Sequence, residues 1–80
     1  MLQQSLTTAP KTHDGKPLVF EETFRSPFER DTVESALAVL ESIRDVHDAA
    51  HGWFELDAYV EKLPNGKYRA VRHHAQYKYN

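Results

Sequence analysis

The sequence predicts an α+β domain, in which a three-stranded, mainly antiparallel sheet carries one amphipathic helix packed across one face. Three observations support the order β-α-β-β. A short alternating segment comes first, a stretch with helical periodicity follows it, and Asn65-Gly66 then separates two runs rich in aromatic and β-branched residues. The strand segments alternate instead of forming continuous apolar runs, and this alternation favours antiparallel pairing.

The first long strand is predicted at residues 17–25, where Leu18, Phe20 and Phe24 supply one apolar side. Glu22 interrupts that side, so we expect the outer end of the strand to be exposed. Residues 1–15 show no sustained period. The predicted organisation is therefore a flexible N-terminal arm, 1–15, followed by a single β-α-β-β domain, 16–80.

The arm has one alternative. Asp14-Gly15 is a turn signal, and it would reverse a short strand around Leu6 into the next segment. We favour the flexible arm because the segment carries no period of its own.

The helix is predicted to begin near Asp31 and to run to about His51. Asp31-Thr32-Val33-Glu34 has the pattern of a capping box, and Gly52 supplies a left-handed stop. An earlier start signal, Ser26-Pro27-Phe28-Glu29, predicts a single turn ahead of the helix. At roughly 100° per residue, the apolar positions share about half of the helix circumference, and acidic residues cluster opposite them. The apolar positions are Val33, Ala36, Leu37, Val39, Leu40, Ile43, Val46 and Ala50.

The hairpin has two candidate registers. A two-residue Asn65-Gly66 turn pairs Val60 with Val71 and gives a coherent apolar face beneath the helix. Pro64 instead prefers position i+1 of a type I turn with Gly66 as a left-handed bulge, and this shifts the register by one residue. We adopt the first register on its apolar pattern and place the last strand in the centre of the sheet, with an edge position as the alternative. The predicted core is then Leu37, Leu40, Ile43, Phe54, Leu56 and Val60.

Composition sets limits on the function. The chain has 80 residues and a formal net charge of −2, which argues against bulk, charge-driven binding of nucleic acid. The absence of cysteine excludes disulfides and thiolate metal sites. A domain of this size buries a modest core, so oligomerisation, for example as a homodimer, stays open as a source of stability.

The beginning of the chain bears on its location. Residues 1–4, Met-Leu-Gln-Gln, lack the basic and apolar regions of a signal peptide, and no apolar run approaches the length of a membrane span. We therefore expect a cytoplasmic protein without a membrane partner.

The chain shows no recognisable pattern of catalytic or metal-ligating residues. His47 and His51 lie four residues apart on the predicted helix, but Asp48 replaces the glutamate of the zinc-protease motif and Gly52 ends the helix at once. His47 is expected to face the sheet and to pack there beside His73 as a hydrogen-bonded histidine pair. We expect a non-enzymatic protein with no catalytic residue, no metal and no cofactor.

The strongest functional signal is a basic and aromatic surface. The returning arm of the hairpin, residues 67–80, carries no acidic residue. In the adopted register, its basic and aromatic side chains lie on the sheet face away from the helix. The predicted partner-binding residues are Tyr59, Tyr68, Arg72, His74 and Lys78.

Two functions fit such a surface. Arginine and tyrosine anchor protein interfaces, and the first prediction is a small non-catalytic protein-binding regulator or inhibitor that acts through its open sheet face. The alternative is a single-stranded nucleic-acid binder, in which the same aromatic and basic side chains stack on bases and contact phosphates. Glu55, Asp57 and Glu61 share that face and would repel phosphate, which favours a protein partner.

Overall fold

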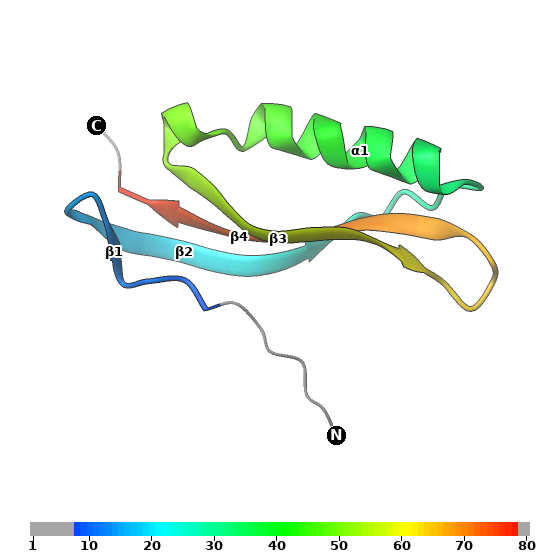
Figure 1. Cartoon of the computed structure of the whole chain (residues 1–80), viewed down its shortest axis with the longest axis horizontal. Coiled ribbons are helices and arrows are strands. Elements are labelled where there is room, and N and C mark those ends of the chain that lie inside the picture. The colour runs from blue at the N-terminus through cyan, green and yellow to red at the C-terminus, as the bar shows by residue number, and fades with distance from the viewer. Residues whose placement is uncertain (1–7, 79–80) are drawn as a thin grey trace, which may run out of the picture.

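The computed structural model describes residues 8–78 and contains one four-stranded antiparallel sheet with one α-helix packed on it (Figure 1). The predicted α+β arrangement is confirmed, with one strand more than the three expected. In chain order, the elements are β1 (Thr12–His13), β2 (Lys16–Arg25), α1 (Val33–Val46), a 3-10 helix η1 (Ala49–His51), β3 (Trp53–Lys62) and β4 (Tyr68–Tyr77). None of the helices among these residues combines the length and the apolar character needed to cross a bilayer.

The additional strand, β1, lies in the segment predicted to be a flexible arm. It pairs with the first two residues of β2 around a reversal at Asp14 and Gly15, whose φ angles are 52° and 76°. Two consecutive residues with positive φ make a two-residue hairpin turn. The turn at Asp14-Gly15 is thus where the sequence predicts it, and the strand directly precedes it. The alternative strand around Leu6 lies outside the described residues.

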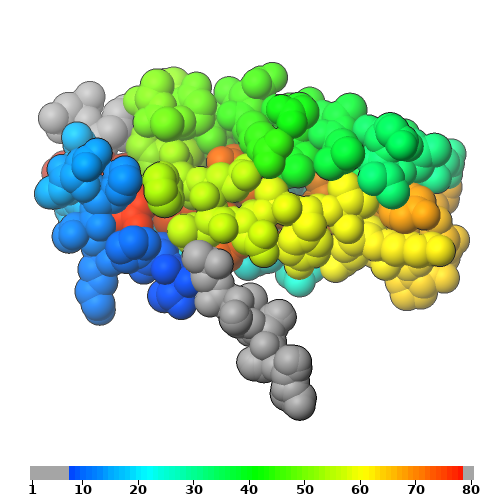
Figure 2. Space-filling model, viewed as in Figure 1, coloured from blue at the N-terminus to red at the C-terminus, as the bar shows by residue number. Residues whose placement is uncertain are grey.

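β4 occupies the centre of the sheet, as predicted, because the strand order is β1-β2-β4-β3. Its small side chains suit this position: Ala70, Val71 and Ala75 have no exposed surface. Helix α1 packs on β4 and β3, and the space-filling view shows α1 and β3 against each other along the molecule (Figure 2). A helix about 10 Å wide covers about two strands spaced ~4.8 Å apart. The helix-facing side of β2 is therefore left uncovered.

The hairpin register adopted from the apolar pattern is wrong. Val60 pairs with Ala70, not with Val71. Gly66 has a φ of 86°, and the Leu63 N–H donates to the Lys67 carbonyl at 2.8 Å. The turn chemistry of Pro64 and Gly66 therefore decides the register, because a hydrogen-bonded turn fixes the pairing locally, before distant side chains meet.

A β-bulge in β3 reconciles this register with the apolar pattern. The pairing with β4 slips between Glu55 and Asp57, so Leu56 is an extra residue. Leu56 packs with Ala75 and Tyr77 on the face away from α1. The described residues thus bury apolar side chains on both faces of the sheet, Leu40 of α1 on one face and Ala75 and Tyr77 on the other.

The predicted core is correct only in part. Leu40 is buried with 2% of its surface exposed, whereas Leu37 is 43% exposed and Phe54 is 37% exposed. The other three predicted core residues, Ile43, Leu56 and Val60, are half-buried. Phe54 is exposed because the bulge at Leu56 reverses the alternation of β3 and places Phe54 opposite Ala75, on the face that α1 does not cover.

Helix α1 is shorter than predicted. The Thr32 hydroxyl caps its start by accepting from the Ser35 N–H at 3.1 Å, and the helix ends at Val46 with His47 as the C-cap. Asp48 then accepts from the His51 N–H and starts η1, and Gly52, at a φ of 87°, ends η1 instead of α1. An aspartate that binds a nearby backbone N–H competes with continuation of the helix.

The single turn predicted at residues 26–29 is not helical. The Ser26 hydroxyl accepts from the Phe28 N–H at 3.0 Å, which is the contact of a cap, but the chain then extends and Arg30 forms an isolated bridge with Tyr68. Strand pairing with β4 therefore outweighs the local start signal.

Candidate protein interface

The structure does not bring the five predicted partner-binding residues together. Arg72 and His74 are buried under α1, with 3% and 0% exposure, because the register is shifted by one residue. Tyr59 is 42% exposed on the opposite face, and Tyr68 is half-buried on the helix side by strand alternation. Lys78 is exposed just beyond β4. The predicted placement of Arg72 and His74 on an open face is therefore corrected.

Arg72 anchors the C-terminal end of α1 to the sheet. Its Nη1 and Nη2 both donate to the His47 carbonyl at 3.3 Å, and its Nε lies 3.1 Å from Glu55 Oε1. Arg44 of α1 holds the same carboxylate through two bonds, at 2.7 and 2.8 Å. These bonds from Arg44 lower the pKa of Glu55, and burial lowers the pKa of Arg72. Arg72 therefore supports the fold instead of presenting a charge to a partner.

An aromatic cluster lies beside this anchor. The rings of His47 and Trp53 stack at 4.1 Å, and His74 approaches them at 5.2 and 4.7 Å. His74 Nε2 lies 3.0 Å from Glu22 Oε2, and burial lowers the pKa of His74 even though this carboxylate opposes the shift. The histidine that packs with His47 is thus His74 and not the predicted His73.

His73 lies on the other face of the sheet. Its Nδ1 is 2.8 Å from the Thr23 hydroxyl, and its Nε2 is 2.8 Å from Glu21 Oε2. Both partners belong to β2, so His73 joins two neighbouring strands. It is separated from His47 by the thickness of the sheet.

The uncovered side of β2 forms an apolar groove against α1. The groove has a volume of about 270 Å³ and is lined by Phe24, Ser26, Phe28, Val39, Ser42, Ile43, Val46 and His47. Val46 is 69% exposed and Phe28 is 56% exposed, although both are large apolar residues. Val19 and Phe20, which are 60% and 43% exposed, continue the apolar surface along β2. Exposed apolar patches of this kind typically mark interaction sites.

The groove lies next to an unpaired strand edge. Within residues 8–78, β1 pairs with β2 only as far as Pro17, and the Leu18 N–H donates to the Lys11 carbonyl. The Ser26 N–H donates to Ala70, so alternate residues back to Glu22 face β4. The backbone groups of Glu21, Thr23 and Arg25 therefore point outward. We refer to the α1–β2 groove, residues 19–20 and the outward-facing residues Glu21, Thr23 and Arg25 together as the β2-edge surface.

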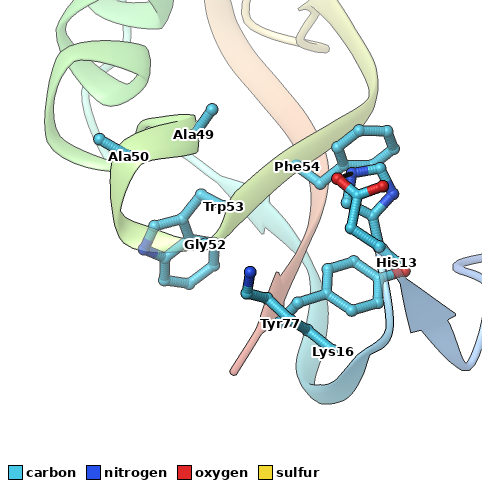
Figure 3. Close-up of a pocket in the computed structure, with 9 residues that line it drawn as sticks. His13, Lys16, Ala49, Ala50, Gly52, Trp53, Phe54 and Tyr77 are labelled. Carbon is cyan, nitrogen blue, oxygen red and sulfur yellow. Dashed lines mark ion pairs between the residues drawn. The ribbon is translucent and has the colours of Figure 1, made fainter. Parts of the chain in front are cut away.

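A second hollow, of about 480 Å³, lies at the end of the molecule where the β1–β2 turn meets η1 (Figure 3). Figure 3 shows Trp53 on one side of it and the rings of His13 and Phe54, whose centroids are 4.6 Å apart, on the other. Its charged lining residues are Asp14 and Lys16, with His13 lying 3.6 Å from Asp14. The lining among residues 8–78 thus combines ring surfaces with single charges.

Comparison of the chain with protein-family models, with curated proteins and with solved structures finds no match. The candidate site therefore rests on the geometry of this chain alone.

The sequence pattern places Phe20 and Phe24 on one apolar side of the first long strand and Val46 among the apolar positions of the helix, but it did not identify the β2-edge surface. The sequence does offer one signal, the width of a single helix, because one helix cannot cover three long strands. Given β4 in the centre, the helix had to leave either β2 or β3 uncovered. The ion pair from Arg44 of α1 to Glu55 of β3 draws α1 to that side.

Proposed function

We propose that this chain is a small non-catalytic regulator or inhibitor that binds another protein molecule through its β2-edge surface. The observation that carries the proposal is the juxtaposition of an apolar groove and a strand edge that stays unpaired within residues 8–78. Backbone groups on such an edge add a strand from a partner, and an adjacent groove receives the partner's side chains. The two features together provide both parts of this recognition mode.

The distribution of large side chains supports this choice. Phe28 and Val46 are more than half exposed, while four of the seven buried apolar residues in the described part of the chain are alanines. Aromatic side chains at an interface give large contact areas at a low entropic cost. A partner on the β2-edge surface would bury the side chains that the small core leaves outside.

Protein docking has better support than binding of single-stranded nucleic acid. A base-stacking surface needs aromatic and basic side chains on one face. Tyr59 and Arg72 lie on opposite faces of the sheet, and Arg72 is engaged with Glu55. The β2-edge surface, in contrast, is lined mainly by apolar side chains.

The proposal can be tested by affinity capture with matched variants. Val46→Lys places a charge in the groove, and a cation in the last turn of a helix is compatible with folding. Tyr59→Lys is the control, since Tyr59 is a partly exposed residue of β3 on the opposite face. Proteins captured from an extract of the native host by the wild type and by Tyr59→Lys, and lost with Val46→Lys, would then be purified and their affinities measured by calorimetry.

We expect Val46→Lys to weaken binding of the purified partner by at least roughly tenfold, as for truncation of an interface anchor. Binding that Tyr59→Lys removes and Val46→Lys leaves intact would contradict the proposal. That outcome would move the interface to the face opposite α1.

A further inference from the structure

We infer that the partner that fits the β2-edge surface is a second copy of this chain, paired through antiparallel β2 strands with Thr23 opposite Thr23. This inference rests on the proposed function, because it names the partner of the same surface. It follows from the symmetry of the edge, from the order of its charges and from the positions of its exposed apolar side chains.

Symmetry makes the edge self-complementary. Two copies of one strand pair antiparallel when a two-fold axis runs perpendicular to the sheet. This axis does not interchange the two faces of the sheet, so both α1 helices lie on the same face of the combined sheet. Since the backbone groups of Glu21, Thr23 and Arg25 point outward, this pairing forms on the order of six hydrogen bonds, two for each of three residue pairs.

Charge selects the register. With Thr23 opposite Thr23, Glu21 of each copy lies directly opposite the partner's Arg25, which gives two cross-strand ion pairs and a central threonine pair. Moving the two-fold axis by two residues along the strand slips the pairing by four residues. In one direction this sets Glu21 against Glu21, and in the other direction it sets Arg25 against Arg25. Pairing around Glu22 sets two carboxylates opposite each other. Opposite charges face each other in the Thr23-centred register, and like charges face each other in these three.

The exposed apolar side chains match in the same register. Val19 and Phe20 lie at one end of the edge, and Phe28 follows its other end. The two-fold axis brings Val19 and Phe20, at the bulged end of one β2, toward the segment of the partner that follows Arg25. Phe28 of each copy therefore lies next to Val19 and Phe20 of the other. The apolar groups that each chain exposes separately then become neighbours.

The size of the core gives a reason for self-association. The buried apolar residues are Ala9, Ala36, Leu40, Ala70, Val71, Ala75 and Tyr77. Small domains with such limited cores usually need reinforcement, and this chain has no cysteine with which to form a disulfide. A symmetric interface supplies the missing burial.

A charge exchange tests the inference. Glu21→Arg alone sets two arginines opposite each other in the dimer, and Arg25→Glu alone sets two glutamates opposite each other. Sedimentation velocity should show a dimer for the wild type and a dimerisation at least roughly tenfold weaker for each single variant. An equimolar mixture of the two variants should dimerise again, because every cross-strand pair is then opposite in charge. Residues 21 and 25 of one strand lie ~13 Å apart, so this rescue cannot arise within one chain.

Asp57→Arg on β3 is the matched control, since it makes the same change of charge on the other edge of the sheet, and it should leave the dimer unchanged. A wild type that stays monomeric at every concentration would overturn the inference, as would a mixture that behaves like the separate variants. If the chain is monomeric and a different protein is captured by the wild type but not by the Val46→Lys variant, the inference fails and the proposed function stands. If the chain is monomeric and the Val46→Lys variant captures every protein that the wild type captures, both fail.

Discussion

The two edges of the sheet differ in how the fold treats them. β3 carries a bulge at Leu56, and two of its acidic side chains are held by cations: Glu55 by Arg44 and Arg72, and Glu61 by Arg69 at 2.6 Å. β2 is also bulged, between Leu18 and Phe20, but its pairing with β4 is regular from Phe20 to Arg25. Bulges and inward-pointing charges are devices that keep a strand edge from pairing. On β2, the residues on the helix side are Phe20, Glu22 and Phe24, beside an apolar groove.

The position of the helix decides which edge of the sheet is available for binding. Helix α1 covers β3 and β4, where the ion pair from Arg44 to Glu55 and the hydrogen bonds from Arg72 to the His47 carbonyl hold it. The same placement leaves β2 without cover. The chain thus stabilises the β3 side of its sheet and exposes the β2 side.

The largest effect is expected in the covered half. Leu40 is buried between α1 and the sheet, and Leu40→Ala should reduce the free energy of unfolding by ~2–5 kcal/mol. Val46→Ala, on the same helix but facing the groove, should cost less than about 1 kcal/mol in the monomer, because Val46 is 69% exposed. Urea denaturation of both variants at a concentration that disfavours self-association checks this contrast. Equal losses would show that the groove side is packed as tightly as the covered side.

A smaller loss is expected when the anchor of α1 is removed. Arg72→Met removes the buried partner of an ion pair whose carboxylate, Glu55, is partly exposed, and should cost roughly 2–3 kcal/mol of stability. Arg25→Met, whose Nε lies 3.9 Å from Glu61 in a more exposed setting, should cost no more than about 1 kcal/mol. Thermal unfolding at one pH and salt concentration, and at a protein concentration that disfavours self-association, compares the two. Similar melting temperatures would mean that Arg72 does not hold the helix on β3 and β4.

The smallest effect concerns pH. The pKa of His74 is lowered by burial in the folded state, so the unfolded chain binds more protons once the pH falls below the ordinary histidine value of about 6.5. His74 therefore contributes a stability that is complete above that pH and is lost as the pH falls through the unfolded and then the folded pKa. His74→Gln should flatten this loss between neutral pH and pH 5, as measured by urea denaturation.

The fold class could be predicted from the sequence because its signals are local. Periodicity placed α1, and turn residues placed the β3–β4 hairpin. At Asp14-Gly15 the turn signal supported only the alternative to the flexible arm that we favoured. The register could not be settled in the same way, because the apolar pattern and the turn chemistry at Pro64 and Gly66 disagreed by one residue. A bulge at Leu56 satisfies both, and no pattern in the sequence locates it.

The same one-residue error in register misplaced the predicted binding site. A one-residue shift moves Arg72 and His74 from the open face to the face under α1. The β2-edge surface depends on which two strands the helix covers, and that choice is made by contacts between residues far apart in the sequence, such as Arg44 with Glu55. Local patterns do not report such contacts.

Amide hydrogen exchange tests whether β2 is the docking edge of the sheet, because it reports on β2 and β3 in one experiment. The amides of Thr23 on β2 and Val60 on β3 both point away from β4, by the alternation set at Ser26 and Leu63. We predict that protection of the Thr23 amide rises with protein concentration, or on saturation with the captured partner, while the Val60 amide stays unchanged. Protection that rises at Val60 and not at Thr23 would show that β3 is the docking edge and would contradict the account.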